Sequence, residues 1–363
     1  MFWTALRIWG EKMTKIPSIL HIMAGKGNGG AETYSTDVML SLHARGVPQC
    51  VVMHEKSLRA PVLTEAGLRV RTDSLHTPLH FWRRHLLRRL IAQEKPDIIH
   101  CWMRRAASLV AGAPTEGSTV LGWFGDYEEI RHFKPCAHLV GCTQDIVTHM
   151  RKNGVSQARS TYISTFPTID HAPALKRSTL NTPENAKVLL TLSRLHSVKG
   201  LDTLMRAIQD MPDCYLWLAG DGPLQGELEH LAQQLGIASR VRFLGWRTDR
   251  GALLRAADIC VLPSRYEPFG TVILEAWESK TPLVACRSAG PAAYVQNEKN
   301  GMLAEIDDAP GLAHALRRVL ENAALRETLI TQGYADYQAK YTREAVTEQW
   351  LAYYKALMKE KKP

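Results

Sequence analysis

The sequence passes from a buried strand to a helix through one stretch, Ile259–Glu278, with the residues ICVLPSRYEPFGTVILEAWE. Its first four residues are apolar and predict a short buried strand, and the run from Thr271 onward predicts a helix. A loop with two prolines and a glycine separates them, since these residues interrupt regular structure. Strand, loop and helix in this order form the repeating unit of a parallel sheet with helices on its faces.

The same alternation continues on both sides of this stretch. We expect further strands at 18–23, 50–54, 97–101, 118–121, 138–141, 161–164, 187–192, 215–219, 241–244 and 283–285. Helices are expected at 31–44, 81–93, 144–152, 201–209, 224–235, 311–321 and 343–359. The alternation is interrupted by 165–186, a polar stretch with three prolines that is typical of a linker. The predicted fold class is therefore α/β, with two Rossmann-like domains facing each other across a cleft.

The length of 363 residues also favours two domains, because it exceeds what one hydrophobic core usually serves. We assign 1–175 to an N-terminal domain with its linker, 176–342 to a C-terminal domain and 343–363 to a last helix. Net charge is shared unevenly, since 1–175 hold 21 Lys and Arg against 14 Asp and Glu, whereas 176–363 hold 24 against 22. The asymmetry indicates that the N-terminal half meets an anionic partner, or that its surface is simply basic.

Cysteine usage and hydropathy set the expected compartment. The seven cysteines are odd in number and scattered, and no Cys-x-x-Cys pair occurs. No secretory signal is recognised at the start of the sequence, and the longest apolar runs are shorter than the roughly 20 residues of a membrane-spanning helix. These features predict a protein of the reducing cytoplasm, with no structural zinc and no metal site.

The loop before Thr271 has the residues of an anion site. Backbone N–H groups at the start of a helix bind phosphate, and Gly270 allows a close approach of the ligand. Glu267 and Glu275 flank this turn, and each ionised carboxylate accepts up to about four hydrogen bonds, which suits a hydroxyl-rich ligand. The alternative is an ordinary helix start with acidic residues nearby.

Four motifs carry a resemblance to a known family. The spacing of Glu267-PFGTVIL-Glu275 resembles the donor-site signature of the family-four retaining glycosyltransferases. Arg194-LHSV-Lys199-Gly200 resembles the Arg-x4-Lys-Gly loop of that family, Gly220-Asp-Gly-Pro its Gly-x-Gly-Pro turn, and Phe243-Leu244-Gly245 its nucleotide-base loop. The resemblance covers nearly all of 187–325, and it implies the GT-B fold, with the last helix crossing back over the N-terminal domain.

The resemblance also implies a role for each motif. Arg194 and Lys199 would neutralise the diphosphate leaving group in place of a metal, since arginine and lysine both pair with phosphate. Glu267 would face the donor sugar, and Glu275 would bind the ribose hydroxyls. The remaining donor-binding residues would be Gly220, Leu244, Phe269, Gly270 and Thr271. Glu267, Arg194 and Lys199 are the expected catalytic residues, and no cofactor is expected beyond a UDP- or GDP-sugar as co-substrate.

A glycine-rich loop in the N-terminal half has two interpretations. Gly25–Gly30 fits Gly-x-Gly-x-x-Gly after a strand, with Glu55 at the end of the next one, which would indicate an NAD-dependent oxidoreductase. Family-four transferases have a Gly-Gly-x-Glu turn at this point, here Gly29-Gly30-Ala31-Glu32, which closes on the donor phosphate. We favour the transferase, because one glycine fingerprint is weaker than four ordered motifs. A third alternative, a non-catalytic sugar-nucleotide-binding protein, would release no free nucleotide diphosphate.

The acceptor side is specified less clearly. The strand end Asp97–Trp102 resembles the Asp-φ-φ-His-x-His motif of the family, so His100 is one acceptor-side candidate, although Trp102 replaces the second histidine. Asp126 follows the next strand and is another candidate. A histidine at a strand end is equally consistent with a core residue.

The expected partners are a nucleotide-sugar donor and a glycan or glycolipid acceptor, with no nucleic acid. In 80–91, arginines at 84, 88 and 89 lie off an apolar stripe of leucine and isoleucine, which favours contact with an anionic membrane or an ordinary solvated helix face. The combination resembles bacterial enzymes that extend lipopolysaccharide cores or other cell-surface glycans, acting in the cytoplasm or on the inner face of the plasma membrane.

Overall fold

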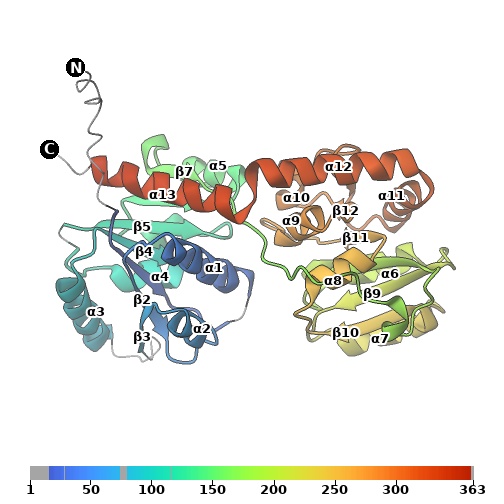
Figure 1. Ribbon diagram of the computed structural model, residues 1–363, viewed down its shortest axis with the longest axis horizontal. Coiled ribbons are helices and arrows are strands. Elements are labelled where there is room, and N and C mark those ends of the chain that lie inside the picture. The colour runs from blue at the N-terminus through green and yellow to red at the C-terminus, as the bar shows by residue number, and fades with distance from the viewer. Residues whose placement is uncertain (1–15, 28, 74–79, 116, 361–363) are drawn as a thin grey trace, which may run out of the picture. The chain divides into compact units, whose positions relative to one another are not determined.

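The computed structural model describes residues 16–27, 29–73, 80–115 and 117–360, with the backbone alone at 80–86 (Figure 1). Its contacts divide the chain into two compact units. One comprises the described residues up to Gly122, His132–His138 and the end of the chain from Thr347. The other comprises Trp123–Arg131 and Leu139–Val346.

The first sheet has seven strands in the order β3-β2-β1-β4-β5-β6-β7. The strands are β1 (Ile19–Met23), β2 (Gln49–His54), β3 (Arg69–Asp73), β4 (Ile98–Trp102), β5 (Thr119–Phe124), β6 (His138–Gly141) and β7 (Ser160–Tyr162). The pairs β1–β2, β1–β4, β2–β3 and β6–β7 are parallel. Every residue of β1, β2, β4 and β5 is buried, which explains their continuous apolar sequence.

The second sheet has six strands in the order β10-β9-β8-β11-β12-β13. They are β8 (Lys187–Leu192), β9 (Cys214–Ala219), β10 (Val241–Gly245), β11 (Ile259–Leu262), β12 (Leu283–Cys286) and β13 (Met302–Ala304). All neighbouring strands pair in parallel. In each sheet the chain therefore starts at a central strand, adds strands toward one edge and then returns to add strands on the other side of the first one. The point at which the strand order reverses is where α/β proteins bind their ligands. The predicted α/β class with two Rossmann-like sheets is confirmed.

Helices lie between the strands in chain order. In the first half they are α1 (Gly30–Ala44), α2 (Ala60–Glu65), α3 (His80–Glu94), α4 (Met103–Val110) and α5 (Gln144–Lys152). In the second half they are α6 (Leu201–Ala207), α7 (Gln225–Gln234), α8 (Arg250–Ala256), α9 (Thr271–Glu278), α10 (Ala289–Tyr294), α11 (Ala309–Glu321), α12 (Ala323–Lys340) and α13 (Arg343–Glu360). Side chains of α6, α7 and α11 share one core with alternate residues of β8, β9 and β11.

The last helix, α13, contributes large side chains to the first unit (red in Figure 1). Trp350 donates from Nε1 to the hydroxyl of Tyr34 in α1 at 2.9 Å. The hydroxyl of Tyr354 lies 2.9 Å from Nδ1 of His100, the central residue of β4. Trp350 and Tyr354 are completely buried, so this helix supplies core to a sheet formed some 250 residues earlier in the chain.

Several elements escaped the sequence analysis. The strand β3 has the sequence RVRTD and lies at the edge of the first sheet, so it lacks an apolar pattern. Helix α12 contains Gly333, a residue that disfavours helices. A Cβ atom at Gly333 would lie 2.5 Å from the Trp277 ring, so the glycine lets α12 pack against α9.

All seven cysteines are buried and free. Burial raises the pKa of the thiols of Cys50, Cys101 and Cys260, among others. None of the helices in the described ranges is both long enough and apolar enough to cross a membrane.

Candidate functional site

The loops after β8 and β9 are locked together by a glycine. Gly220 has a φ of +147°, and a Cβ atom there would lie 2.0 Å from the carbonyl oxygen of Ser193. Its N–H donates to the carbonyl of Gly245 at 2.8 Å, which ties it to the end of β10 beside the half-buried Leu244. Gly220 thus allows three strand ends to approach closely.

Two of the predicted site residues form an ion pair. Lys199, in the loop before α6, places Nζ 2.7 Å from Oε2 of Glu267 in the loop after β11. The two side chains are 15% and 14% exposed, so the pair is mostly shielded from water yet reachable by a ligand. The Glu267 carbonyl accepts from Gly290 N–H at 2.7 Å, which fixes its backbone. A phosphate entering this site would compete with Glu267 for the lysine.

Arg194 differs from Lys199 in being exposed. It follows β8 directly, and its guanidinium forms no ion pair with any residue that the structure describes. An unpaired guanidinium beside a shielded Lys–Glu pair gives the end of β8 a surplus of positive charge, as a diphosphate requires.

The start of α9 presents backbone N–H groups beside Glu267. Gly270 is the N-cap residue with a φ of +85°, and Thr271 begins the helix. The Phe269 side chain is buried and stacks on Tyr294, with ring centroids 5.3 Å apart. The Tyr294 hydroxyl donates to the Phe269 carbonyl, which holds the turn in place. First-turn N–H groups of a helix have no intrahelical acceptor and are available to an anion.

Glu275 is almost completely buried and contacts Arg250 of α8. The Arg250 guanidinium donates to Oε1 of Glu275, whereas Oε2 has no hydrogen-bond partner in the described structure. Burial raises the pKa of the Glu275 carboxyl, and the Arg250 charge opposes the shift. The sequence analysis missed Arg250, since no motif marks an arginine 25 residues before its partner.

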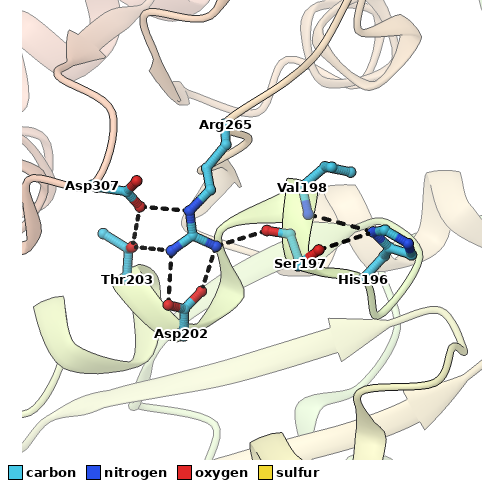
Figure 2. Close-up of polar contacts among 7 residues, drawn as sticks. All are labelled: His196, Ser197, Val198, Asp202, Thr203, Arg265 and Asp307. Atoms are coloured by element: carbon cyan, nitrogen blue, oxygen red, sulfur yellow. Dashed lines mark hydrogen bonds and ion pairs between the residues drawn. The ribbon is translucent and has the colours of Figure 1, made fainter.

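Arg265 was also missed, and it fastens the donor-side loops to one another (Figure 2). Its guanidinium donates to both carboxylate oxygens of Asp202, at 2.9 and 2.7 Å, and to Asp307 at 2.6 Å. It also donates to the Ser197 carbonyl at 2.6 Å. The loop that carries Lys199 is therefore attached to the loop that carries Glu267 by bidentate and single hydrogen bonds.

In the first unit, the glycine-rich loop encloses a carboxylate. Gly29 is the N-cap residue of α1, and Gly30 begins the helix. A Cβ atom at Gly25 would lie 2.5 Å from Oε1 of Glu32, and one at Gly27 would lie 3.2 Å away. Glu32 therefore lies against the loop backbone at Gly25 and Gly27. Residue 28 lies outside the described ranges.

His100 is completely buried. Its ring stacks on Trp102 at a centroid distance of 4.0 Å, and Trp102 donates from Nε1 to Nδ1 of His21 at 3.2 Å. His21 in turn contacts Gln49 at 2.9 Å through Nε2. Burial lowers the pKa of both histidines, that of His21 to about 3. In this arrangement His100 belongs to a packed core cluster and presents no surface to an acceptor.

Asp126, the second acceptor-side candidate, is half-buried in the loop after β5. Its carboxylate accepts from the N–H of Tyr127 at 2.7 Å and from the hydroxyl of Tyr266. Among the described residues, no three His, Cys, Asp or Glu side chains are grouped as a metal site would require.

The comparisons with known proteins agree on one family. Residues 28–166 match the model of Glycosyltransferase Family 4, and residues 174–336 match that of Glycosyl transferases group 1. The chain is 33% identical to the lipopolysaccharide core biosynthesis glycosyltransferase LpsE of Rhizobium meliloti (strain 1021), over 92% of this chain and 97% of that one. It is 32% identical to LpsD of the same organism, over 92% and 96%.

A solved structure supports the same fold. HepE of Anabaena, in complex with UDP and glucose, aligns with a TM-score of 0.80 at 22% identity, over 93% of this chain and 99% of that one. None of these comparisons supports an oxidoreductase. The chain therefore belongs to the family-four glycosyltransferases of GT-B fold and is a glycosyltransferase.

Proposed function

We propose that the enzyme transfers a hexose or N-acetylhexosamine from a UDP- or GDP-sugar to a hydroxyl of a glycan or glycolipid, with retention of the anomeric configuration. The observation that carries this proposal is the charge pattern at the ends of β8 and β11. There Arg194, which has no ion pair among the described residues, lies in the loop that also carries Lys199, and Lys199 pairs with Glu267 of the loop after β11. The names of LpsE and LpsD support a role in lipopolysaccharide core or other cell-surface glycan synthesis.

In the proposed reaction the bond between the anomeric carbon and the diphosphate oxygen breaks, and the acceptor oxygen bonds to that carbon. The acceptor proton passes to an oxygen of the departing phosphate, so atoms and charge balance and no separate protein base is needed. Arg194 and Lys199 stabilise the negative charge that develops on the leaving group. Such preorganised electrostatic stabilisation is usually the largest contribution to catalysis.

The other donor-side residues would orient the substrate. Lys199 would shift from Glu267 toward the phosphate and free that carboxylate to accept from sugar hydroxyls. The first-turn N–H groups at Gly270 and Thr271 would bind phosphate or sugar, and Leu244 would pack against the base. Glu275 would accept from the ribose. The Gly29–Gly30 turn at the start of α1 would also bind donor phosphate, as its resemblance to the Gly-Gly-x-Glu turn of the family implies.

The acceptor would combine apolar and anionic groups. A cavity of about 500 Å³ in the first unit lies between strands β1–β3 and α3. Its apolar walls among the described residues are Ile22, Val52, Leu87, Leu90 and Leu109. The charged side chains that line it are Arg71 and Arg89, which are exposed, and Asp73, so cations outnumber carboxylates there. These features support a glycolipid acceptor and peripheral contact with an anionic membrane from the cytoplasmic side. Of the arginines named in α3, that at 84 has no described side chain, whereas Arg88 and Arg89 are described and exposed.

A ligand screen by thermal unfolding tests the proposal. UDP, GDP and NAD would be added separately to the full chain at increasing concentrations. A nucleoside diphosphate at about 100 times its Kd adds about 2.7 kcal/mol to stability, which raises the Tm by several degrees. We expect stabilisation by UDP or GDP and none by NAD. A rise in Tm with NAD alone would contradict the transferase assignment at this site.

Transfer itself would be measured as nucleotide release. The matching UDP- or GDP-sugar is incubated with purified lipopolysaccharide core oligosaccharide, and free nucleoside diphosphate and the extended glycan are quantified together. Anomeric configuration of the product, read by proton NMR, tests retention. An inverted product would overturn the proposed stereochemistry while leaving the transferase assignment intact.

A further inference from the structure

Arg250 connects Glu275, the carboxylate proposed to bind the ribose, to the polar segment 165–186 that separates the two halves of the sequence. Its Nη1 donates to Glu275, and its Nη2 donates to the carbonyl oxygen of Thr168 at 2.8 Å. Arg250 begins α8, and its side chain is 32% exposed, whereas that of Glu275 is 2% exposed. One guanidinium therefore serves both the buried donor-side carboxylate and the segment 165–186, predicted as the linker.

The contact leaves half of the Glu275 carboxylate unused. Oε1 is committed to Arg250, and Oε2 is buried with no hydrogen-bond partner in the part of the chain that the structure describes. A buried acceptor without a donor costs free energy, which a ligand hydroxyl recovers when it donates there. The carboxylate is thus oriented by one partner and keeps its other oxygen for a second.

The same segment is anchored at neighbouring points. Asp170 accepts from the N–H of Gly251 at 2.7 Å, and its carbonyl accepts from Arg255 at 2.9 Å. Arg343 donates to the Thr168 hydroxyl at 3.1 Å. Arg250 adds to this anchoring a direct hydrogen bond to Glu275. Arg255 is therefore a natural control, because it anchors the segment without reaching the carboxylate.

We propose that Arg250 is a positioning residue for donor binding, which orients Glu275 toward the ribose and couples occupancy of the donor site to the linker at Thr168. The inference rests on the proposed function, since it assigns Glu275 to the nucleotide. When ribose hydroxyls donate to Oε2 of Glu275, the nucleotide, Glu275 and Arg250 would form one hydrogen-bonded network. The linker carbonyl belongs to that network, so its mobility falls when the donor binds.

The charges around Glu275 give the proposal a pH signature. Burial raises the pKa of this carboxyl, Glu278 of the same helix raises it further, and Arg250 of α8 lowers it. Cys260 of β11 also interacts with this carboxyl. Without Arg250 the carboxyl would take up a proton at a higher pH and lose acceptor capacity. Nucleotide affinity of such a variant should then increase as pH rises, because the ionised form is the one that binds hydroxyls.

The test compares Arg250→Gln, Arg250→Lys and Arg255→Gln in the full chain. The probe is UDP, or GDP if the wild type binds only that nucleotide, and its Kd is measured by calorimetry at pH 6, 7 and 8. We expect Arg250→Gln to weaken binding at least about tenfold, as loss of a charged hydrogen bond implies, with most of the loss at pH 6. Arg250→Lys should retain much of the affinity, and Arg255→Gln should bind within about twofold of the wild type.

Hydrogen exchange provides the readout for coupling. UDP should slow exchange in 166–172 of the wild type and of Arg255→Gln, and leave it unchanged in Arg250→Gln. Wild-type affinity in a folded Arg250→Gln protein would overturn the proposal, and so would equal weakening by Arg255→Gln. If Arg250→Gln does not fold, UDP binding to the wild type that leaves hydrogen exchange in 166–172 unchanged overturns it instead. A wild type that binds neither UDP nor GDP fails the proposed function itself.

Discussion

The carboxyl ends of the two sheets differ, although the strand orders correspond. In the first sheet, β1 and β4 carry His21, His100 and Trp102, which stack and hydrogen-bond among themselves in the core. In the second sheet, β8 and β11 lead into loops that carry Lys199 and Glu267, charged and within reach of a ligand. Aromatic side chains and histidines pack together in the first sheet, whereas an ion pair joins the loops that follow β8 and β11 in the second.

This difference explains which part of the function is easy to recognise. A diphosphate and a ribose require cations, free N–H groups and carboxylates at fixed spacing, so a donor site leaves motifs in the sequence. An acceptor that differs between enzymes imposes no such shared requirement. The experiments below test this difference between the two sheets, beginning with the charged residues that follow the strands of the second sheet.

The largest effect is expected from Lys199→Ala. It removes the cation of the shielded pair, so charge on the departing diphosphate is stabilised less, and kcat/KM for transfer should fall about 100-fold or more. Initial rates of nucleotide release measure the change, and the Tm reports on folding. Lys187→Ala, which removes an exposed lysine at the start of β8, should keep wild-type turnover. Normal turnover in a folded Lys199→Ala enzyme would show that Lys199 does not stabilise the leaving group.

An intermediate effect, on stability, is expected when the buried histidines of the first sheet are titrated. His21 and His100 are held neutral by burial, whereas in the unfolded chain they bind protons below pH about 6.5. Stability present above that pH should therefore be lost as pH falls toward the folded pKa, about 3 for His21, by up to about 1.4 kcal/mol per pH unit for each histidine. Thermal unfolding of the wild type at pH 7, 6 and 5 measures this loss.

The matched variant for that measurement is His100→Phe combined with Tyr354→Phe, which removes both members of one buried hydrogen bond. Replacing both partners by apolar rings is nearly neutral for folding, and one titrating group disappears. The variant should lose stability less steeply in acid and keep turnover within about twofold. A 100-fold loss of turnover with an unchanged Tm would instead place His100 in the chemistry.

The smallest effect is expected at the membrane. Arg89 is exposed on α3, and Arg89→Gln should weaken binding to vesicles of anionic phospholipid about fivefold, as about 1 kcal/mol per arginine implies. Co-sedimentation at low and high salt measures it, because screening removes such contacts. Arg206→Gln, which removes an exposed charge from α6, should bind as the wild type does. Equal binding by all three proteins would contradict a role of α3 in membrane contact.

The sequence predicted the elements that have a local pattern. Most buried strands and most of the longer helices lie close to their expected ranges, and β5 merely continues to Phe124, whereas β13, α4 and α8 were not predicted. The exposed edge strand β3 and the glycine-containing α12 were missed, because tertiary contacts rather than local pattern stabilise them.

Site residues follow the same rule. Lys199 and Glu267 were singled out by their motifs, and the structure places both in loops at the carboxyl ends of neighbouring strands. Arg250 and Arg265 could not be found in this way, because their partners come from other loops. The burial of His100 depends on Tyr354, 254 residues later in the sequence, so no local pattern reveals it.

The buried free cysteines have a practical consequence. Cys50, Cys101 and Cys136 belong to the first unit, whereas Cys142, Cys214, Cys260 and Cys286 belong to the second. A thiol reagent reaches a buried sulfur only after local opening, so the labelling rate at each site reports the free energy of that opening. Mass spectrometry after short pulses would then rank the two units by resistance to unfolding without any engineered probe.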